Sequence, residues 1–348
     1  MSLVKAAIHA FEDTPMPDMV SRAAIHFLVS DARRRLAGAP AGASASFART
    51  MGEHPIAAHT DAANAQHYEL PAAFFEVVLG PNLKYSSGLY PPGASTLAEG
   101  EAAALHETEL HADLQDGQAV LELGCGWGSL SLWMAERFPG SKITSVSNSA
   151  SQRAFIQARA AARGLSNLTV ITADMNDFST DQRFDRVVSV EMFEHMSNWQ
   201  ALLGRVNGWL KPDGLLFIHV FTHRNTPYRF DVNDPADWIA QYFFTGGVMP
   251  SHDLPRQFPD LFTVEQDWRW SGAHYARTAQ QWLENFDASR AVIDPVLERV
   301  YGSDAAVWRR RWRLFFLATA GLFGHRGGEE WGVSHYRLRP VLQTTSPA

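Results

Sequence analysis

The sequence predicts an α/β fold built on a doubly wound parallel sheet, and three observations carry this prediction. Between residues 118 and 225, short apolar runs alternate with helical segments, which is the pattern of right-handed strand–helix–strand crossovers. Glycines at positions 124, 126 and 128 follow the first apolar run. Two acids and a histidine follow the fourth run, at the edge of the sheet where such folds bind ligands.

Three regions are expected along the chain. Residues 1–75 form an N-terminal helical segment, because apolar residues recur at helical spacing over residues 19–36, and residues 37–46 have the composition of a linker. Residues 76–225 form a Rossmann-like core, with an irregular aromatic loop at residues 84–93. Residues 226–348 hold seven of the eleven tryptophans and are expected to form a helical, aromatic-rich cap that completes the fold.

The core strands are short, apolar and bounded by turn residues, as buried parallel strands are. They are expected at residues 119–123, 142–146, 168–171, 184–190 and 215–221. The helices between them are expected at residues 130–138, 151–163 and 199–210, with Pro139-Gly140 and Gly164 as two of the stop signals.

Composition limits the classes of partner. Lysine and arginine total 30 against 37 aspartates and glutamates, so charge gives no reason to expect nucleic acid. The single cysteine, Cys125, rules out an internal disulfide and suits a reducing compartment. The longest apolar stretch, residues 314–323, is about half the length of a membrane-spanning helix. We therefore expect a cytoplasmic protein with a small-molecule partner and no stable membrane insertion; a homodimer stays open.

The glycine-rich stretch indicates a nucleotide-type cofactor. Gly124 and Gly126 lie where the first strand turns into a helix, so the backbone can approach a ligand there. The spacing G-x-G-x-G differs from that of nicotinamide dinucleotide sites, and Glu122 precedes the first glycine by two residues. A carboxylate suits the amino group of S-adenosyl-L-methionine (SAM), which we favour over a nicotinamide cofactor.

Polar residues after the second and third strands are expected to hold the adenosine. The second strand ends in Ser-Asn-Ser, where Asn148 can bond a ribose and Gln152 lies one helical turn further on. The acid that usually binds the ribose of a dinucleotide is missing, which disfavours a nicotinamide-dependent oxidoreductase. Asp174 suits an adenine amino group and Met175 its ring. For Asn148 and Asp174, a helix N-cap is the alternative.

Glu191, Glu194 and His195 form an acid–histidine cluster after the fourth strand. A methyl acceptor that is an amine must lose a proton, and carboxylates and imidazoles are suitable bases. A carboxylate also holds a cationic amine in place. The alternative is a solvated loop with a satisfied histidine. We expect no metal, because these side chains do not make a complete ligand shell and cysteine ligands are absent.

Several segments together resemble one family. Residues 85–88, 122–128 and 191–196 are similar to the cyclopropane-fatty-acid-synthase superfamily of SAM-dependent methyltransferases, which have the class I methyltransferase fold. Within it, residues 147–149, 242–247, 274–276, Thr278 and 328–331 resemble the plant coclaurine and pavine N-methyltransferases. The resemblance implies that Tyr85 and Ser86 contact the methionine end of SAM, that Gly124 and Gly126 back it, and that Glu191, Glu194 and His195 are catalytic.

The resemblance also separates amine from lipid chemistry. In cyclopropane synthases a bicarbonate acts as base, held by a cysteine, a glutamate, a histidine and a tyrosine; the matching positions are Ser87, Glu194, His219 and Tyr275. The cysteine is replaced by serine, and Glu191 stands where the lipid enzymes have glycine. Both differences favour an amine acceptor.

The aromatic residues of the cap allow two interpretations. Most could be packing residues; together they could form a wall that stacks on an aromatic amine and attracts its cation. The expected substrate-binding residues are His219, Tyr242, Phe243, Tyr275, Phe323 and Trp331.

We therefore expect a SAM-dependent N-methyltransferase that acts on a small, aromatic or isoquinoline-type amine by direct methyl displacement and releases S-adenosyl-L-homocysteine. Glu194 and His195 would remove or relay the proton, and Glu191 would position the nitrogen. The alternatives are cyclopropanation or C-methylation of unsaturated acyl lipids, a nicotinamide-dependent oxidoreductase, and a SAM-binding protein without catalysis.

Overall fold

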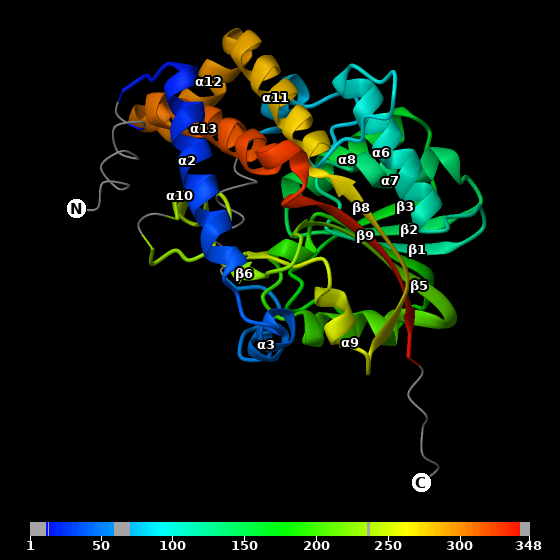
Figure 1. Cartoon of the computed structure of the whole chain (residues 1–348). Helices are drawn as coiled ribbons and strands as arrows, with labels where there is room; N and C mark the ends of the chain where they lie inside the picture. Colours follow the sequence, from blue (N-terminus) through cyan, green and yellow to red (C-terminus); the bar gives the residue numbers. More distant parts are fainter. Residues whose placement is uncertain (1–11, 13, 59–69, 235–236, 342–348) are drawn as a thin grey trace.

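A seven-stranded sheet is the centre of the molecule (Figure 1). The computed structural model describes residues 12, 14–58, 70–234 and 237–341. The strand order is β3-β2-β1-β4-β5-β9-β8. The first five strands are parallel and comprise β1 (Ala119–Leu123), β2 (Lys142–Ser147), β3 (Leu168–Thr172), β4 (Phe184–Val190) and β5 (Leu210–His223). This arrangement confirms the predicted doubly wound α/β fold.

Three of the four helices of the parallel half begin at a residue whose side chain caps them. The four helices are α6 (Leu97–His111), α7 (Ser129–Arg137), α8 (Ala150–Ala162) and α9 (Trp199–Trp209). The exception is α7, which begins after Gly128 and so has no side chain at that position to cap it. Thr96 and Glu99 form a capping box at the start of α6, and the side chains of Ser149 and Asn198 cap α8 and α9. Asn148 is therefore not the N-cap of α8, which removes the structural alternative considered for it.

The C-terminal region contributes to the sheet as well as to the cap. β8 (Phe262–Ser271) and β9 (Trp331–Pro340) are antiparallel strands, and β9 lies between β5 and β8. Between them come α11 (Gly272–Ala288), α12 (Arg290–Tyr301) and α13 (Ala305–Phe323). The sequence predicted a helix-rich, aromatic-rich region with loops here, and the two strands were not foreseen. β9 is buried on both faces and includes Ser334 and His335, so it shows neither an alternating pattern nor a continuous apolar run.

The N-terminal helices pack against this cap. α2 (Asp18–Ala37) packs across α13 (Figure 1), while α3 (Ala43–Met51) lies beside α9. α5 (Ala72–Val78) packs on α11 and α12. The expected linker is shorter than predicted, because α3 already begins at Ala43. Short elements complete the chain: β6 (Tyr228–Arg229), β7 (Val248–Met249), α10 (Trp238–Tyr242), and 3-10 turns at Phe193–His195, Leu254–Gln257, Gly302–Asp304 and His325–Gly328.

Aromatic side chains fill the space between the cap helices and the sheet. Trp282, Trp312 and Phe316 are fully buried, and both indole rings contact Phe316, one edge-on and one tilted, arrangements that aromatic pairs prefer. Within the part of the chain that the structure describes, no helix is both long and apolar enough to cross a membrane.

Candidate active site

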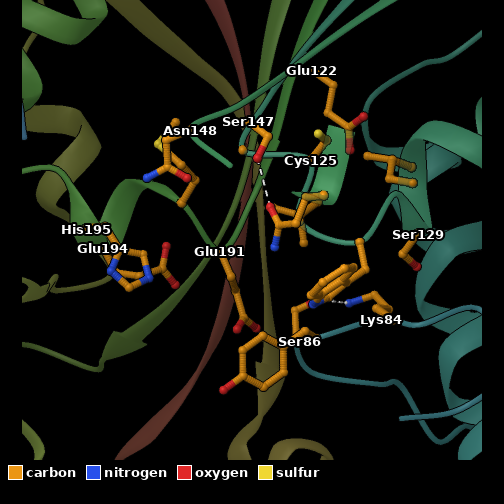
Figure 2. A pocket seen from close by; sticks show the side chains of 18 of the residues that line it. Lys84, Ser86, Glu122, Cys125, Ser129, Ser147, Asn148, Glu191, Glu194 and His195 are labelled. Atoms are coloured by element: carbon orange, nitrogen blue, oxygen red, sulfur yellow. Dashed lines mark hydrogen bonds between the residues drawn. The ribbon is translucent and has the colours of Figure 1, made fainter. Parts of the chain in front are cut away.

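A cavity opens at the carboxyl ends of β1, β2 and β4, and α11 and the loop at residues 84–87 close it. Figure 2 shows Glu194 and His195 on one side, Lys84 and Ser129 on the other, and Glu191 between them. Most of the residues predicted from the sequence line this cavity: Tyr85, Ser86, Glu122, Gly124, Gly126, Asn148, Gln152, Asp174, Met175, Glu191, Glu194, His195 and Tyr275.

The glycines after β1 serve different purposes. Gly124 has a φ of +81°, and a Cβ there would lie 2.6 Å from the Cβ of Met192, so packing against the loop after β4 requires glycine. Gly126 has a φ of +50°, and a Cβ there would meet no protein atom within 4 Å. Gly126 therefore exposes backbone to the cavity, where a ligand can approach closely.

Two polar atoms beside this loop point to a polar ligand. Trp127 Nε1 and Ser129 Oγ are buried, line the cavity and have no hydrogen-bond partner among the described residues. Buried polar groups normally have a partner. The residues present therefore fit a cofactor that carries polar groups, as the amino-acid end of SAM does.

Glu122 is fixed by hydroxyl groups from two neighbouring elements. Its Oε2 accepts hydrogen bonds from Ser131 on α7 and, at 2.7 Å, from Ser145 on β2. Burial raises the pKa of Glu122 to about 7, and the two hydroxyl bonds oppose this shift. A cationic ligand group beside it would favour the charged form of this carboxylate.

The residues expected to hold the adenosine surround the ends of β2 and β3. Gln152 accepts a 2.8 Å hydrogen bond from Ser147 Oγ through Oε1, which orients its amide on the first turn of α8. Asp174 accepts a 2.7 Å bond from the backbone N–H of Asn176 and so forms an Asx turn rather than a helix cap. Asn148 and Met175 also line the cavity.

Glu191 is held at a sharp turn at the end of β4. Its φ of +47° lies in the left-handed region, which is strained for a residue with a side chain. Oε1 accepts a 2.9 Å bond from the backbone N–H of Ser87 and lies 3.2 Å from Nε2 of His219. Oε2 accepts a 2.6 Å bond from the phenol of Tyr275. Three separate segments therefore fix this carboxylate.

Lys84 is a cavity residue that sequence reasoning missed. Its Nζ donates to Ser86 Oγ at 2.5 Å and to the carbonyl of Ser87 at 2.7 Å. Burial lowers the pKa of Lys84 from 10.5 to about 8, while the negative charges of Glu191 and Glu101 act in the opposite direction. The signal in the sequence was a lysine directly before Tyr85 and Ser86, but nothing in the sequence showed that it is buried.

Glu194 and His195 form a 3-10 turn beside Glu191. Glu194 is fully buried, and its Oε2 has no hydrogen-bond partner among the described residues. Burial, and next the nearby charge of Glu191, raise the pKa of Glu194 well above its ordinary value. The ring of His195 stacks on Phe244 with centroids 4.9 Å apart and an angle of 6° between the planes.

Of the six expected substrate residues, Tyr275 lines the cavity and the other five do not. Phe243 is fully buried and stacks on Phe315 with centroids 4.4 Å apart. Phe323 stacks on Tyr275 with centroids 4.4 Å apart, and His219 contacts Glu191 from within the sheet. The other two are Tyr242, which lies under the guanidinium of Arg311, and Trp331, which bonds the hydroxyl of Tyr228. Phe244 lines the cavity instead of its neighbour.

The sheet order, the glycine loop after β1 and the cavity beside it define a class I SAM-dependent methyltransferase. The model of the mycolic acid cyclopropane synthetase family matches residues 57–327, so the chain belongs to this family. SAM is its cofactor, as in the other members.

Proteins with different acceptors are similar to this chain. It is 35% identical over 295 residues to (S)-coclaurine N-methyltransferase from Thalictrum flavum subsp. glaucum, covering 83% of this chain and 82% of the relative. It is 32% identical over 271 residues to the cyclopropane-fatty-acyl-phospholipid synthase of Escherichia coli K12, covering 77% and 66%. The crystal structure of coclaurine N-methyltransferase bound to N-methylheliamine and SAH superimposes with a TM-score of 0.90, at 32% identity, over 97% of this chain and 100% of that one.

Proposed function

We propose that the chain transfers the methyl group of SAM to the nitrogen of a small aromatic or isoquinoline-type amine. The observation that carries this proposal is the anchored carboxylate of Glu191, which faces the same cavity as the glycine loop. A fixed, buried carboxylate attracts a cationic amine and aligns it. The likeness to a structure that holds N-methylheliamine supports this class of acceptor.

The residues around the glycine loop would hold the cofactor. Tyr85 and Ser86 would contact its methionine end, with Gly124 and Gly126 behind it and Glu122 near its amino group. The adenosine would lie among a second set of residues, namely Asn148, Gln152, Asp174 and Met175. When bound, SAM supplies an electrophilic methyl group on a positively charged sulfur.

The acid–histidine cluster would prepare the amine. Glu194 and His195 would remove or relay the proton of the ammonium form, and Glu191 would hold the nitrogen in line with the methyl group. Burial and the charge of Glu191 raise the pKa of Glu194, which makes this carboxylate a stronger base than an exposed one and supports its role as the proton acceptor. The stacked ring of Phe244 would keep His195 in place.

The surroundings of Glu191 argue against lipid cyclopropanation. The groups that would hold bicarbonate in the lipid enzymes belong to residues 87, 194, 219 and 275. Three of these residues, Ser87, His219 and Tyr275, contact the carboxylate of Glu191 in this chain. The protein's own carboxylate therefore takes the contacts that a bound bicarbonate would need.

Incubation with methyl-labelled SAM tests the proposal. We expect label to pass to a tetrahydroisoquinoline-type secondary amine and not to vesicles of unsaturated phospholipid. Glu191→Gln and His195→Ala should lower kcat while SAM binding, measured by calorimetry, changes little. Labelled phospholipid without labelled amine would contradict the acceptor class, and full activity in both variants would contradict the roles of these residues.

The proposal also covers the domains, the location and the oligomeric state. After the N-terminal segment 1–75, residues 76–225 would hold the cofactor and residues 226–348 would form the acceptor side of the site. The bond from Tyr275 to Glu191 supports this division, because it brings the last region to the core site. The buried, single Cys125 suits a cytoplasmic location. A homodimer would appear as a doubled mass in light scattering.

A further inference from the structure

Three buried histidines form a continuous row that starts at the active-site carboxylate. Nε2 of His219 lies 3.2 Å from Oε1 of Glu191, and its Nδ1 lies 2.8 Å from Nε2 of His335. Nδ1 of His335 lies 2.8 Å from Nδ1 of His111. Nε2 of His111 lies 3.1 Å from Oε1 of Glu107. We call His219, His335 and His111 the histidine row.

The fold places this row across three elements. His219 on β5 and His335 on β9 are direct register partners in the antiparallel pair, so their side chains share one face of the sheet. α6 crosses this face and supplies His111. The inner end reaches the cavity through Glu191, whereas Glu107 at the outer end has 34% of its side chain exposed. The row therefore joins the cavity to the protein surface.

The surroundings bury the row and disfavour a positive charge on its rings. His219 and His335 are fully buried, and Trp268 and Trp270 of β8 cover the row, with Trp268 stacked on His111. Burial lowers the pKa of His219 and of His335 well below the ordinary value and that of His111 to about 4. The other charged groups that face the row are Lys84 at the inner end and Arg337 at the outer end.

The neutral histidine row has one proton fewer than it has contacts. Three neutral imidazoles carry one N–H each, whereas the row has four contacts, of which the two outermost end on carboxylates. With both carboxylates ionised, one contact is left without a proton. One additional proton completes all four contacts. Among the described residues, no group of three ligating side chains is arranged to hold a metal ion, so a metal does not account for the row.

We propose that the histidine row is a proton relay that carries the proton of the acceptor amine from Glu191 to Glu107 at the surface. The inference rests on the proposed amine acceptor, and it assigns a function to His335 and His111. Both lie outside the cavity and act through Glu191 and His219, so they are positioning and relay residues rather than catalytic ones.

The protons and electrons of the relay balance. The ammonium group of the acceptor loses its proton to Glu194, which passes it to the neighbouring carboxylate of Glu191. The N–H electrons remain as the lone pair that attacks the methyl carbon. The carbon–sulfur bond breaks, and its electrons stay on sulfur. Glu191 then protonates Nε2 of His219, whose Nδ1 proton moves to Nε2 of His335. The Nδ1 proton of His335 moves to His111, which releases its Nε2 proton to Glu107 and water.

The relay is tested with His335→Gln and a basic secondary amine as the acceptor. At pH 7 the amine arrives protonated, so we expect kcat to fall about 100-fold, at the lower end of the range that proton transfer contributes. As the pH approaches the pKa of the amine, a larger fraction of the acceptor arrives neutral. This fraction has no proton to lose and does not need the relay. The activity of the variant should therefore approach that of the wild type as the pH rises.

His252→Gln is the matched control. His252 bonds Ser334, the residue before His335, and Asp267. Within the described part of the chain it makes no hydrogen bond or ring contact with the histidine row. It should retain the wild-type pH profile. The melting temperature and the calorimetric SAM affinity show whether each variant is folded. If His335→Gln does not fold, His111→Gln takes its place and is judged by the same changes in kcat and pH profile.

Two results would overturn the relay while leaving the proposed function intact. One is wild-type turnover in the folded His335→Gln or His111→Gln variant at pH 7. The other is a loss of kcat that is equal at every pH, because a structural defect does not depend on the protonation of the acceptor. If the wild-type chain methylates no amine at all, the proposed function fails and the relay fails with it.

Discussion

The phenol of Tyr275 donates a 2.6 Å hydrogen bond to Oε2 of Glu191. Tyr275 lies on α11, which comes between β8 and β9 in the chain, whereas Glu191 directly follows β4. This bond is one of three contacts that fix the carboxylate, and it is the one made by the cap.

Tyr275→Phe should remove this contact and lower kcat. A hydrogen bond to a charged group is worth about 1.5–3 kcal/mol, which corresponds to roughly 10- to 100-fold in rate. Tyr90→Phe is the control, because its hydroxyl bonds Gln281 on the same helix and its side chain does not line the cavity. Steady-state kinetics with a small amine measure kcat in both variants. An equal loss of kcat in the two would mean that the position of α11 matters and the hydrogen bond to Glu191 does not.

Gly126→Ala and Gly124→Ala should have different consequences. A methyl group on Gly126 enters open cavity space, so we expect SAM to bind roughly tenfold more weakly, about 1.4 kcal/mol. A methyl group on Gly124 collides with Met192, which should lower the free energy of unfolding by about 1–3 kcal/mol. Calorimetry with SAM and urea denaturation separate the two effects. Unchanged SAM affinity in Gly126→Ala would contradict a cofactor at this loop.

Lys84 should make stability depend on pH. Its pKa is about 8 in the folded protein against 10.5 for the free side chain, so between these values the unfolded chain binds more protons. Stability therefore rises with pH across this window. The free energy of unfolding of the wild type, relative to Lys84→Met, should increase between pH 8 and 10.5. Urea denaturation at several pH values measures this difference, and a flat difference would show that Lys84 titrates normally.

The neighbours Phe243 and Phe244 should separate stability from activity. Phe243→Ala removes a fully buried ring and should cost about 3–5 kcal/mol of the free energy of unfolding. Phe244→Ala removes the ring that stacks on His195 at the cavity wall, so it should lower kcat or raise KM with a smaller loss of stability. Denaturation and kinetics on both variants test this, and the reverse pattern would contradict the assignment of the wall.

The parallel half of the fold was predictable because its strands are short apolar runs between turn residues. The antiparallel half was not. β8 lies at the sheet edge and carries Glu265, Gln266 and Asp267, whereas β9 is buried on both faces and still contains Ser334 and His335. Neither strand matches the simple pattern of apolar residues by which strands are recognised.

Residues close to a motif were predictable, and residues brought together by packing were not. The acid–histidine cluster, Glu191, Glu194 and His195, spans five residues directly after a predicted strand. Its position in the sequence was therefore enough to predict that it lines the cavity. His111 and His335 meet only because β9 pairs with β5 and α6 crosses both. Whether Phe243 or Phe244 faces the cavity depends on the short helix before them, which the sequence did not reveal.

The position of β9 has a consequence for biosynthesis. β9 pairs with β5 along nearly its whole length, yet it leaves the ribosome long after β5 does. Until then, the nascent polypeptide presents the exposed backbone of β5 as an open edge, which is prone to aggregation. Chaperone dependence during translation should therefore decline once the segment containing Trp331 to Pro340 has emerged from the exit tunnel.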